Sequence, residues 1–335
     1  MPVTAKDVAR ELNLSQPTVS RILNGDHRHR ASDVTRRRVM DAAQRLGYQP
    51  NAVARSLRHG RTNIIGVHTS RIYDVRNDFL GTIVGALQCA SGAYELDLML
   101  HSAVHGSPAE VMFGKLRDGR VDGLILHSAT EDPLVNLLSQ SSLPVVAVAD
   151  PLPGLPSVTC DDAGGMRALI DVLWDKGYRK FVFLAPRVSL ASVVRRQQAF
   201  QAYLEARGTA PEDRKIVLID YEVAAPALPE LLRLPGHVAV CCWNDGTAYE
   251  LLKACKAENV AVPERLAIAG FDGFRDDKLP ARQLVTAVCP WEAVATTALK
   301  LLVDLISKRS RGNVDRCLCS EEICLPVAIS PGDTI

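Results

Sequence analysis

The sequence lacks any long apolar run. No stretch of its 335 residues approaches the roughly 20 consecutive apolar residues that a membrane-spanning helix requires. The first residues, MPVTAKDVAREL, place Lys6, Asp7 and Arg10 in a helical pattern and include no apolar segment of signal-peptide type. We therefore expect a protein with no membrane partner that stays in the cytoplasm.

Catalytic motifs are also missing. The chain contains no P-loop, no G-x-G-x-x-G that opens a helix, no G-x-S-x-G turn and no H-E-x-x-H pair. The adjacent acids Asp161 and Asp162 look like a turn that leads into a helix, and Asp245 has only the amide Asn244 beside it. These absences argue against an enzyme and predict no cofactor.

The nine cysteines show no regular spacing. The closest group, Cys317, Cys319 and Cys324, lacks the C-x2-C pairs and histidine partners of a zinc site. We expect reduced, buried thiols that act as small hydrophobic groups, and no metal site.

Positive charge is concentrated at one end of the chain. Residues 1–61 hold 12 Lys/Arg and 5 Asp/Glu, a net charge of +7, whereas the remainder holds 27 basic and 33 acidic residues, a net charge of −6. A small basic module on a mildly acidic body favours a polyanionic partner for the module, although a solvated basic surface has the same composition.

Helix start and stop signals crowd the first fifty residues. Thr4 is placed to cap one helix, and Ser15 a second that has Pro17 in its first turn and ends at Asn24-Gly25. A third helix begins near Ser32. Two short helices about three residues apart, the second with a polar start, predict a helix-turn-helix, whose second helix enters the major groove of DNA.

After residue 62 short apolar runs alternate with amphipathic segments, which indicates βαβ units and parallel sheets buried on both faces. One large sheet is possible, but two similar subdomains fit the length better. The runs are residues 64–67, 96–100, 124–126, 145–148, 181–184, 216–219, 238–242 and 266–269.

Ligands of such sheets bind beyond the carboxyl ends of the strands. The polar and aromatic candidates that follow the apolar runs are Tyr73, Asp74, Phe79, His127, Ser128, Asn244, Asp245 and Asp272. Carboxylates, an amide and aromatic rings suit a small hydroxylated molecule. Asn244 and Asp272 have a second interpretation, since both residue types also cap turns.

Two sets of motifs resemble the lactose-repressor (LacI/GalR) family of transcription regulators. VTAKDVARELNLSQPTVSRILNG followed by RLGYQPNAVARSLRHGRT resembles its headpiece and hinge, although the loop HRHR is about two residues longer than usual. VDGLIL, DDAGG, WND, VPERLAIAGFDG and TAVCPWEAVA resemble its periplasmic-binding-protein-like core. The resemblance implies a small all-α helix-turn-helix headpiece at 1–49, a hinge at 50–61 and an α/β core of two parallel-sheet subdomains at 62–335.

Carried over residue by residue, the resemblance implies three groups of DNA contacts in the headpiece and hinge. The expected base contacts are Gln16, Pro17 and Arg21, and arginine matches guanine O6 and N7 bidentately. The expected phosphate contacts are Thr4, Ser15, Thr18, Ser20 and Asn24, of which Thr4 and Ser15 also suit plain helix capping. Leu57 would wedge into the minor groove with Asn51 and Ala54 alongside, or the hinge is a flexible linker.

In the core, the resemblance implies lobes of about 62–160 plus 291–322 and about 161–290 plus 323–335. Arg196 matches the ligand-anchoring arginine, and Tyr221 falls near an aromatic wall. Three residues depart from the family pattern: Asp78 replaces a proline, Ala199 a glycine, and Trp243 is large enough to narrow the pocket.

Together these features predict a cytoplasmic, nucleoid-associated transcription regulator, most simply a repressor. As a homodimer it would bind a near-palindromic operator in double-stranded DNA, modulated by a small effector such as a sugar or nucleoside. The tail, LPVAISPGDTI, has no heptad pattern, which favours a dimer over a larger assembly. The alternative function is that of a solute-binding protein with no transcriptional role.

Overall fold

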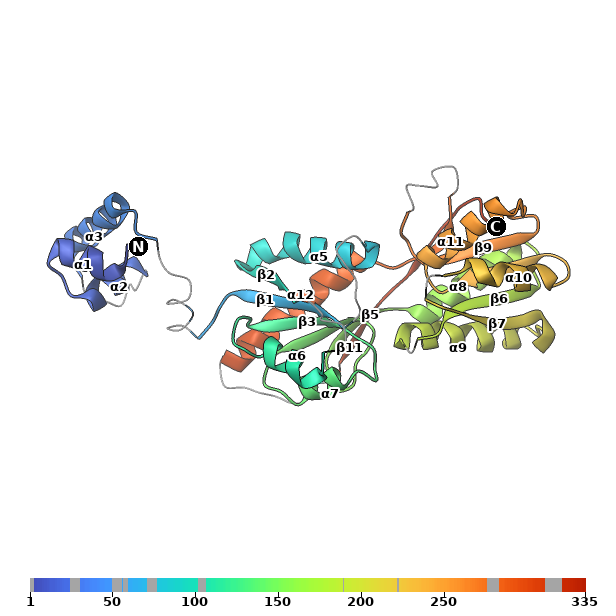
Figure 1. Ribbon diagram of the computed structural model, residues 1–335, viewed down its shortest axis with the longest axis horizontal. Helices are drawn as coiled ribbons and strands as arrows, with labels where there is room; N and C mark the ends of the chain where they lie inside the picture. Colours follow the sequence, from blue (N-terminus) through green and yellow to red (C-terminus); the bar gives the residue numbers. More distant parts are fainter. Residues whose placement is uncertain are drawn as a thin grey trace. The chain divides into compact units, whose positions relative to one another are not determined.

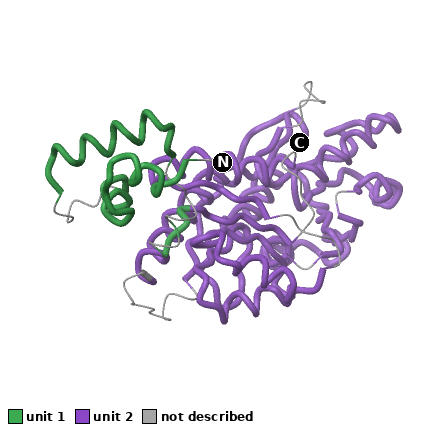
Figure 2. The backbone as a smooth tube through the Cα atoms, turned by 60° about the vertical axis from the view of Figure 1, so that its left-hand side comes forward, with its two compact units in different colours: residues 1–63 green, residues 64–335 purple. Residues whose placement is uncertain are grey.

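The computed structural model describes residues 3–24, 31–49, 56, 60–70, 77–101, 107–188, 190–221, 223–275, 283–310 and 321–335. The chain divides into two compact units, residues 1–63 and residues 64–335 (Figure 2). We call the first unit the headpiece unit and the second the core. Within the described ranges, no helix has both the length and the apolar character needed to cross a membrane.

Local capping sets the ends of the three headpiece helices. The Thr4 side chain accepts a hydrogen bond from the Asp7 amide, the Ser15 side chain one from Thr18, and the Ser32 side chain one from Thr35. These bonds satisfy backbone donors that a helix start leaves without a partner. They confirm the helix starts expected from the sequence, and the helices are α1 (Ala5–Leu12), α2 (Gln16–Leu23) and α3 (Asp33–Leu46).

A small apolar core holds these helices together. It is built from one face of each helix, with its buried members at Val8, Ala9, Val19, Ile22, Val39, Ala42 and Ala43. Because the apolar positions recur at helical spacing, the opposite faces of the helices are left for solvent or for a partner.

The first sheet of the core is entirely parallel, with strand order β11-β5-β4-β3-β1-β2 (Figure 1). Its strands are β1 (Ile64–Thr69), β2 (Asp97–Leu100), β3 (Gly123–His127), β4 (Val145–Ala149), β5 (Ser157–Cys160) and β11 (Glu322–Leu325). Its helices are α5 (Asp78–Ser91), η1 (Gly92–Tyr94), α6 (Ala109–Leu116), α7 (Pro133–Ser139) and α12 (Trp291–Ser310).

Burial on both faces explains the unbroken apolar runs in this sheet. In β3, Leu124 and Leu126 pack into a cluster with residues of α6 and α7. Ile125, between them, belongs to the larger cluster that includes residues of α5 and α12. Successive side chains of a strand point to opposite faces, so the run from Leu124 to Leu126, which is buried on both faces, is apolar throughout.

The second sheet has the order β12-β10-β9-β8-β6-β7 and is parallel except for the β10–β12 pair. Its strands are β6 (Lys180–Pro186), β7 (Arg214–Ile219), β8 (Val238–Cys242), β9 (Leu266–Asp272), β10 (Val285–Val288) and β12 (Ala328–Ser330). Its helices are α8 (Asp162–Asp175), α9 (Ala191–Ala206), α10 (Leu228–Arg233) and α11 (Asp245–Ala257), with short 3-10 turns η2 (Pro211–Asp213) and η3 (Ala225–Ala227).

We call the two sheets with their helices the first and second lobes. The chain passes between the lobes three times: after β5, after β10 and after β11. The expected third crossing after residue 322 is wrong, because β11 pairs with β5 from Glu322 through Leu325 and so keeps residues 323–325 in the first lobe. The two-lobed α/β architecture confirms the expected fold class.

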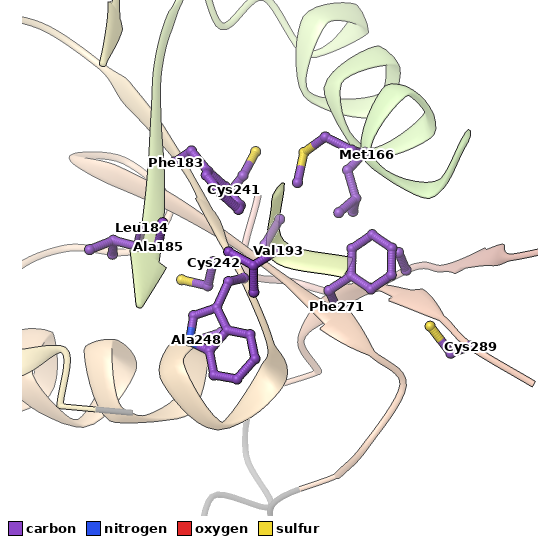
Figure 3. Close-up of a cluster of buried hydrophobic side chains, with 14 of the residues drawn as sticks. Met166, Phe183, Leu184, Ala185, Val193, Cys241, Cys242, Ala248, Phe271 and Cys289 are labelled. Atoms are coloured by element: carbon purple, nitrogen blue, oxygen red, sulfur yellow. The ribbon is translucent and has the colours of Figure 1, made fainter. Parts of the chain in front are cut away.

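Cysteines contribute to the interior of the second lobe. Figure 3 shows Cys241 and Cys242 of β8 among Phe183, Val193 and other buried side chains. Burial raises the pKa of the Cys241 thiol to about 12, so this thiol stays protonated and packs as a small apolar group. Five of the seven described cysteines are buried, whereas Cys89 and Cys324 are exposed. Cys317 and Cys319 lie outside the described residues.

Candidate functional site

The second helix of the headpiece unit presents a polar surface. Gln16, Pro17 and Arg21 are all exposed, while Val19 and Ile22 on the opposite face are buried in the small core. Pro17 lies in the first turn of α2, where its missing amide hydrogen removes no helical bond. Packing of Val19 and Ile22 therefore fixes which side of α2 faces outward, and the three expected base contacts lie on that side.

The five expected phosphate contacts all lie at helix ends or on α2. Thr4 and Asp7 form a reciprocal capping box, and the Ser15 hydroxyl lies 2.8 Å from the Thr18 hydroxyl. At the other end of α2, the Asn24 amide donates to the Ser20 carbonyl at 2.6 Å. These side chains thus stabilise the ends of α1 and α2, and contact with phosphates remains a prediction.

The expected hinge contacts Asn51, Ala54 and Leu57 lie outside the described residues, as do Tyr73, Asp74 and the loop of residues 27–30. Nothing in the structure bears on their predicted roles.

A cavity of about 570 Å³ is lined by residues of both lobes. Seven of the expected effector residues line it: Phe79, His127, Arg196, Tyr221, Asn244, Asp245 and Asp272. Ser128 does not, because its hydroxyl donates to Asp132 at 2.7 Å and lies 2.8 Å from the Ser70 hydroxyl. The strand ends therefore converge as expected, and Ser128 instead stabilises the turn that follows β3.

Arg196 is fixed on the second-lobe side of the cavity. Its Nε donates to Asp162 at 2.8 Å, its Nη1 donates to the Trp243 carbonyl at 2.5 Å, and its Nη2 lies 3.6 Å from Asp272. The guanidinium stacks on Phe271, 3.6 Å from the ring centroid. With 3% of its surface exposed, Arg196 is a rigid anchor that aligns the Asp272 carboxylate along the wall of the cavity.

Asp162 is a partner that the sequence interpretation missed. Asp161 does begin α8, because its side chain accepts a hydrogen bond from Gly164 at 2.8 Å. Asp162, however, points into the interior and is 2% exposed. Burial raises its pKa to about 6, against the opposing charge of Arg196. The acid pair therefore combines a helix cap with a buried counter-ion.

Asp245 and Asn244 organise the loops of the second lobe. The Asp245 carboxylate accepts bonds from the Gly273 and Phe274 amides at 2.7 and 2.6 Å and from the Thr286 hydroxyl at 2.6 Å. Burial raises the pKa of Asp245 to about 7. Asn244 caps α11 by accepting from the Thr247 amide at 2.8 Å. Both side chains thus hold the cavity wall in place.

On the first-lobe side, Asp150 forms a link between the lobes that was not expected. Its carboxylate accepts a bond from the Ser192 amide of α9 at 2.7 Å and lies 3.4 Å from His127 Nε2. Burial alone would raise the pKa of Asp150, but bonds from His127 and Ser192 lower it overall. Asp150 directly follows β4, which ends at Ala149, so the rule that selected the polar residues after the other strands would have found it.

Aromatic rings line both sides of the cavity. On the first lobe, the Phe79 ring lies 4.9 Å from that of Trp291 and 5.0 Å from that of His127. On the second lobe, the rings of Tyr221 and Trp243 are 5.2 Å apart. Trp243 lines the cavity, as expected from its size, while Trp291 is an addition to the expected set.

Backbone strain also gathers at this cavity. Three lining residues that are not glycine have positive φ: Ala149 at 70°, Tyr221 at 33° and Asp272 at 119°. Ala149 is the centre of a tight turn in which the Asp150 amide donates to the Val148 carbonyl. Such conformations cost about 1–3 kcal/mol each and cluster at functional sites. The strain positions Asp150, Tyr221 and Asp272 around the cavity.

Residues 4–51 match the bacterial regulatory proteins of the lacI family, and residues 170–321 match a periplasmic binding protein-like domain. Catabolite control protein A of Priestia megaterium is 29% identical over 319 residues, which cover 92% of this chain and 94% of that relative. The HTH-type transcriptional regulator GalS of Salmonella typhimurium is 29% identical over 308 residues, covering 89% of this chain and 88% of the relative.

Two solved structures are similar over nearly the whole chain. A lac repressor dimer bound to operator and the anti-inducer ONPF matches with a TM-score of 0.80 at 22% identity, covering 100% of this chain and 99% of that one. The transcriptional regulator CelR in complex with cellobiose matches with a TM-score of 0.72 at 25% identity, covering 99% and 100%.

A helix-turn-helix unit followed by a two-lobed core with a ligand-sized cavity defines a DNA-binding transcription regulator. The chain combines a DNA-binding domain of the lacI family of bacterial regulatory proteins with a periplasmic binding protein-like domain.

Proposed function

We propose that this protein is a repressor that binds a near-palindromic operator as a homodimer and responds to a small hydroxylated effector, a sugar or a nucleoside, in the cavity of the core. One observation carries the DNA-binding part: α2 exposes Gln16, Pro17 and Arg21 on one face while its other face is packed. A recognition helix needs this arrangement, because its side chains must reach base edges without disturbing the core.

A dimer supplies two such helices, one for each half-site. The net charge of +7 in residues 1–61 attracts the phosphate backbone and accelerates encounter with DNA. Because the target is chromosomal DNA, we place the protein in the cytoplasm at the nucleoid. Its role is regulatory rather than catalytic.

The effector acts through the two lobes. A ligand in the cavity contacts residues of both lobes, so it stabilises one angle between them over another. Reciprocal linkage then makes DNA and effector affect each other's affinity by the same factor. The solved relatives contain operator DNA in one case and cellobiose in another, which supports both halves of the proposal.

The test begins with selection of a preferred palindrome from random DNA by the full-length protein. Affinity for that palindrome and for random competitor is then measured by fluorescence anisotropy over a range of salt concentrations. We expect Arg21→Ala to lower the ratio of specific to random affinity by about tenfold to a hundredfold, because a bidentate arginine–guanine contact contributes about 1–3 kcal/mol of discrimination. Leu57→Gly should weaken binding to the palindrome as well.

Arg45→Ala is the matched control, since Arg45 is an exposed arginine of α3 that pairs with Glu11 of α1 at 2.7 Å. This variant should keep the preference for the palindrome. A wild-type protein that binds all sequences equally, or none, would show that it is a solute binder without a transcriptional role.

A further inference from the structure

Helix α9 of the second lobe begins without a cap of its own. Its N-cap residue, Leu190, has an apolar side chain that makes no capping hydrogen bond. The first amides of a helix have no intrahelical acceptor and need a partner from elsewhere. The Ser192 amide, in the first turn of α9, donates to the Asp150 carboxylate of the first lobe at 2.7 Å. This hydrogen bond therefore exists only while the two lobes keep their present angle.

An ion pair joins the same helix to the first lobe. Arg195, one turn further along α9, donates from its two Nη atoms to the Glu322 carboxylate at 2.5 and 2.9 Å. Glu322 begins β11, which pairs with β5 in the first sheet, so the ion pair crosses from one lobe to the other. Two parallel N–H···O bonds add geometric specificity to the attraction between the charges. We call Arg195 and Glu322 the interlobe pair.

Glu322 is held in place for this contact. The Thr159 hydroxyl, on neighbouring β5, donates to Glu322 Oε1 at 2.6 Å, and Thr159 itself is fully buried. The bonds from Arg195 and Thr159 lower the pKa of Glu322, so its carboxylate stays charged at neutral pH. An exposed ion pair normally loses side-chain entropy when it forms, and a partner that is already fixed loses less. The interlobe pair is therefore better ordered than an ordinary surface pair.

The interlobe pair lies beside the cavity rather than in it. Ser192 and Arg196 line the cavity, whereas Arg195 and Glu322 do not. Arg195 nevertheless acts on the cavity wall. Burial raises the pKa of Asp162, the counter-ion of Arg196, and the charges of Arg196 and Arg195 both oppose that rise. The interlobe pair can therefore bias the angle between the lobes without touching a ligand.

We propose that Arg195 and Glu322 form a latch between the lobes, positioned by Thr159, which favours the present lobe angle when no effector is bound. The two side chains are 36% and 30% exposed, so salt screens their attraction and weakens the latch. Operator affinity depends on the lobe angle under the proposed function, so the latch also sets the affinity that an effector then changes. That regulatory consequence rests on the proposed function, whereas the latch itself does not.

Hydrogen exchange of the Ser192 amide measures the latch directly. This amide loses its acceptor whenever the lobes separate, so its exchange rate in the full-length protein reports that opening. Mass spectrometry with residue-level fragmentation gives the rate. Glu322→Gln and Arg195→Gln each remove the ion pair, and each should speed the exchange about twofold to fivefold, the range of a partly exposed pair. The double variant should exchange no faster than the faster single variant, because both changes remove one contact.

Asp171→Asn is the matched control. Asp171 of α8 pairs with Arg207 at the end of α9, and their side chains are 40% and 29% exposed, but both belong to the second lobe. Exchange of the Ser192 amide should keep the wild-type rate in this variant. Raising NaCl from about 0.05 to about 0.5 M should speed the exchange more in the wild type than in Glu322→Gln. Thr159→Val removes only the supporting hydroxyl, so it should speed exchange less than Glu322→Gln does while keeping the wild-type response to salt.

Three outcomes would overturn the latch: a wild-type exchange rate in Glu322→Gln, an equal acceleration in Asp171→Asn, or the same response to salt with and without the Glu322 carboxylate. Affinity for the selected palindrome tests the regulatory consequence. Glu322→Gln and Arg195→Gln should change this affinity in the same direction by about twofold to fivefold, and an unchanged affinity would remove that consequence. A wild-type protein that binds no palindrome contradicts the proposed function, yet exchange of the Ser192 amide still decides on the latch.

Discussion

Replacement of Arg196 by methionine offers a quantitative test of the buried charge cluster. Arg196→Met keeps an apolar stem against Phe271 but removes every donor to Asp162 and to the Trp243 carbonyl. Asp162, at 2% exposed, would be left as a buried carboxylate without its counter-ion. Removal of one partner of a buried ion pair costs about 3–5 kcal/mol.

For a unit the size of the core, 1 kcal/mol corresponds to a shift of about 2–4 °C in Tm. We therefore expect Arg196→Met to lower the Tm of the core by roughly 6–20 °C. The Tm is measured by circular dichroism at pH 8. The isolated carboxyl can relieve its cost by binding a proton, so the loss should be smaller at pH 5.5. Adding Asp162→Asn to the variant should recover part of the loss, because no isolated charge remains.

Arg187→Met provides the matched control. Arg187 pairs with Asp220 at 3.5 Å, and the two side chains are 61% and 86% exposed. An exposed pair contributes about 0–1 kcal/mol, so the Tm of this variant should change by no more than a few degrees. Equal changes in Tm for Arg196→Met and Arg187→Met, or a loss in Arg196→Met that is independent of pH and unaffected by Asp162→Asn, would show that Asp162 is not a buried charge held by Arg196.

Two further predictions concern a helix cap and a buried acid. Thr4→Ala removes the side-chain hydrogen bonds that stabilise the start of α1 and that lower the pKa of Asp7. Hydrogen exchange of the α1 amides should then show this helix destabilised by about 0.5–2 kcal/mol. Unchanged protection of these amides would show that the cap does not stabilise α1. Burial raises the pKa of Asp245 from 3.8 to about 7, so between these values the folded chain keeps a proton that the unfolded chain has lost. Stability should therefore fall as pH rises from about 4 to 7, on the order of 4 kcal/mol in total. The slope of Tm against pH between 6 and 7 should be shallower in Asp245→Asn, and equal slopes would contradict the raised pKa.

Features that depend on neighbours in the sequence were predictable. The starts of α1, α2 and α3 follow from Thr4, Ser15 and Ser32, whose side chains bond to an amide three residues away. The eight apolar runs all became strands, and the runs in β3, β4 and β8 are apolar throughout because both faces of these strands are buried. The missed strands β5, β10, β11 and β12 are only three or four residues long, and polar residues interrupt some of them, so no run marks them.

The candidate cavity was predictable in location but not in its contacts. The carboxyl ends of parallel strands meet at one edge, so Phe79, His127 and Asp272 could be grouped from the sequence. Arg196 was predicted as a ligand contact only from the resemblance of the sequence to the LacI/GalR family. Ser128 has the same position in the sequence pattern as these residues, yet it bonds to Asp132 and is not among the residues that line the cavity.

The sequence by itself determined the helix-turn-helix, the alternation of strands and helices, and the edge at which the candidate effector residues gather, because capping and strand burial act within a few residues. Only the tertiary structure decided that Asp162 pairs with Arg196 and that Asp150 binds the Ser192 amide. These partners are 34 and 42 residues apart. Packing of α8 against α9 within the second lobe brings the first pair together, and the meeting of the two lobes brings the second pair together. Their energetic roles arise from burial and proximity, which a linear pattern of residues does not contain.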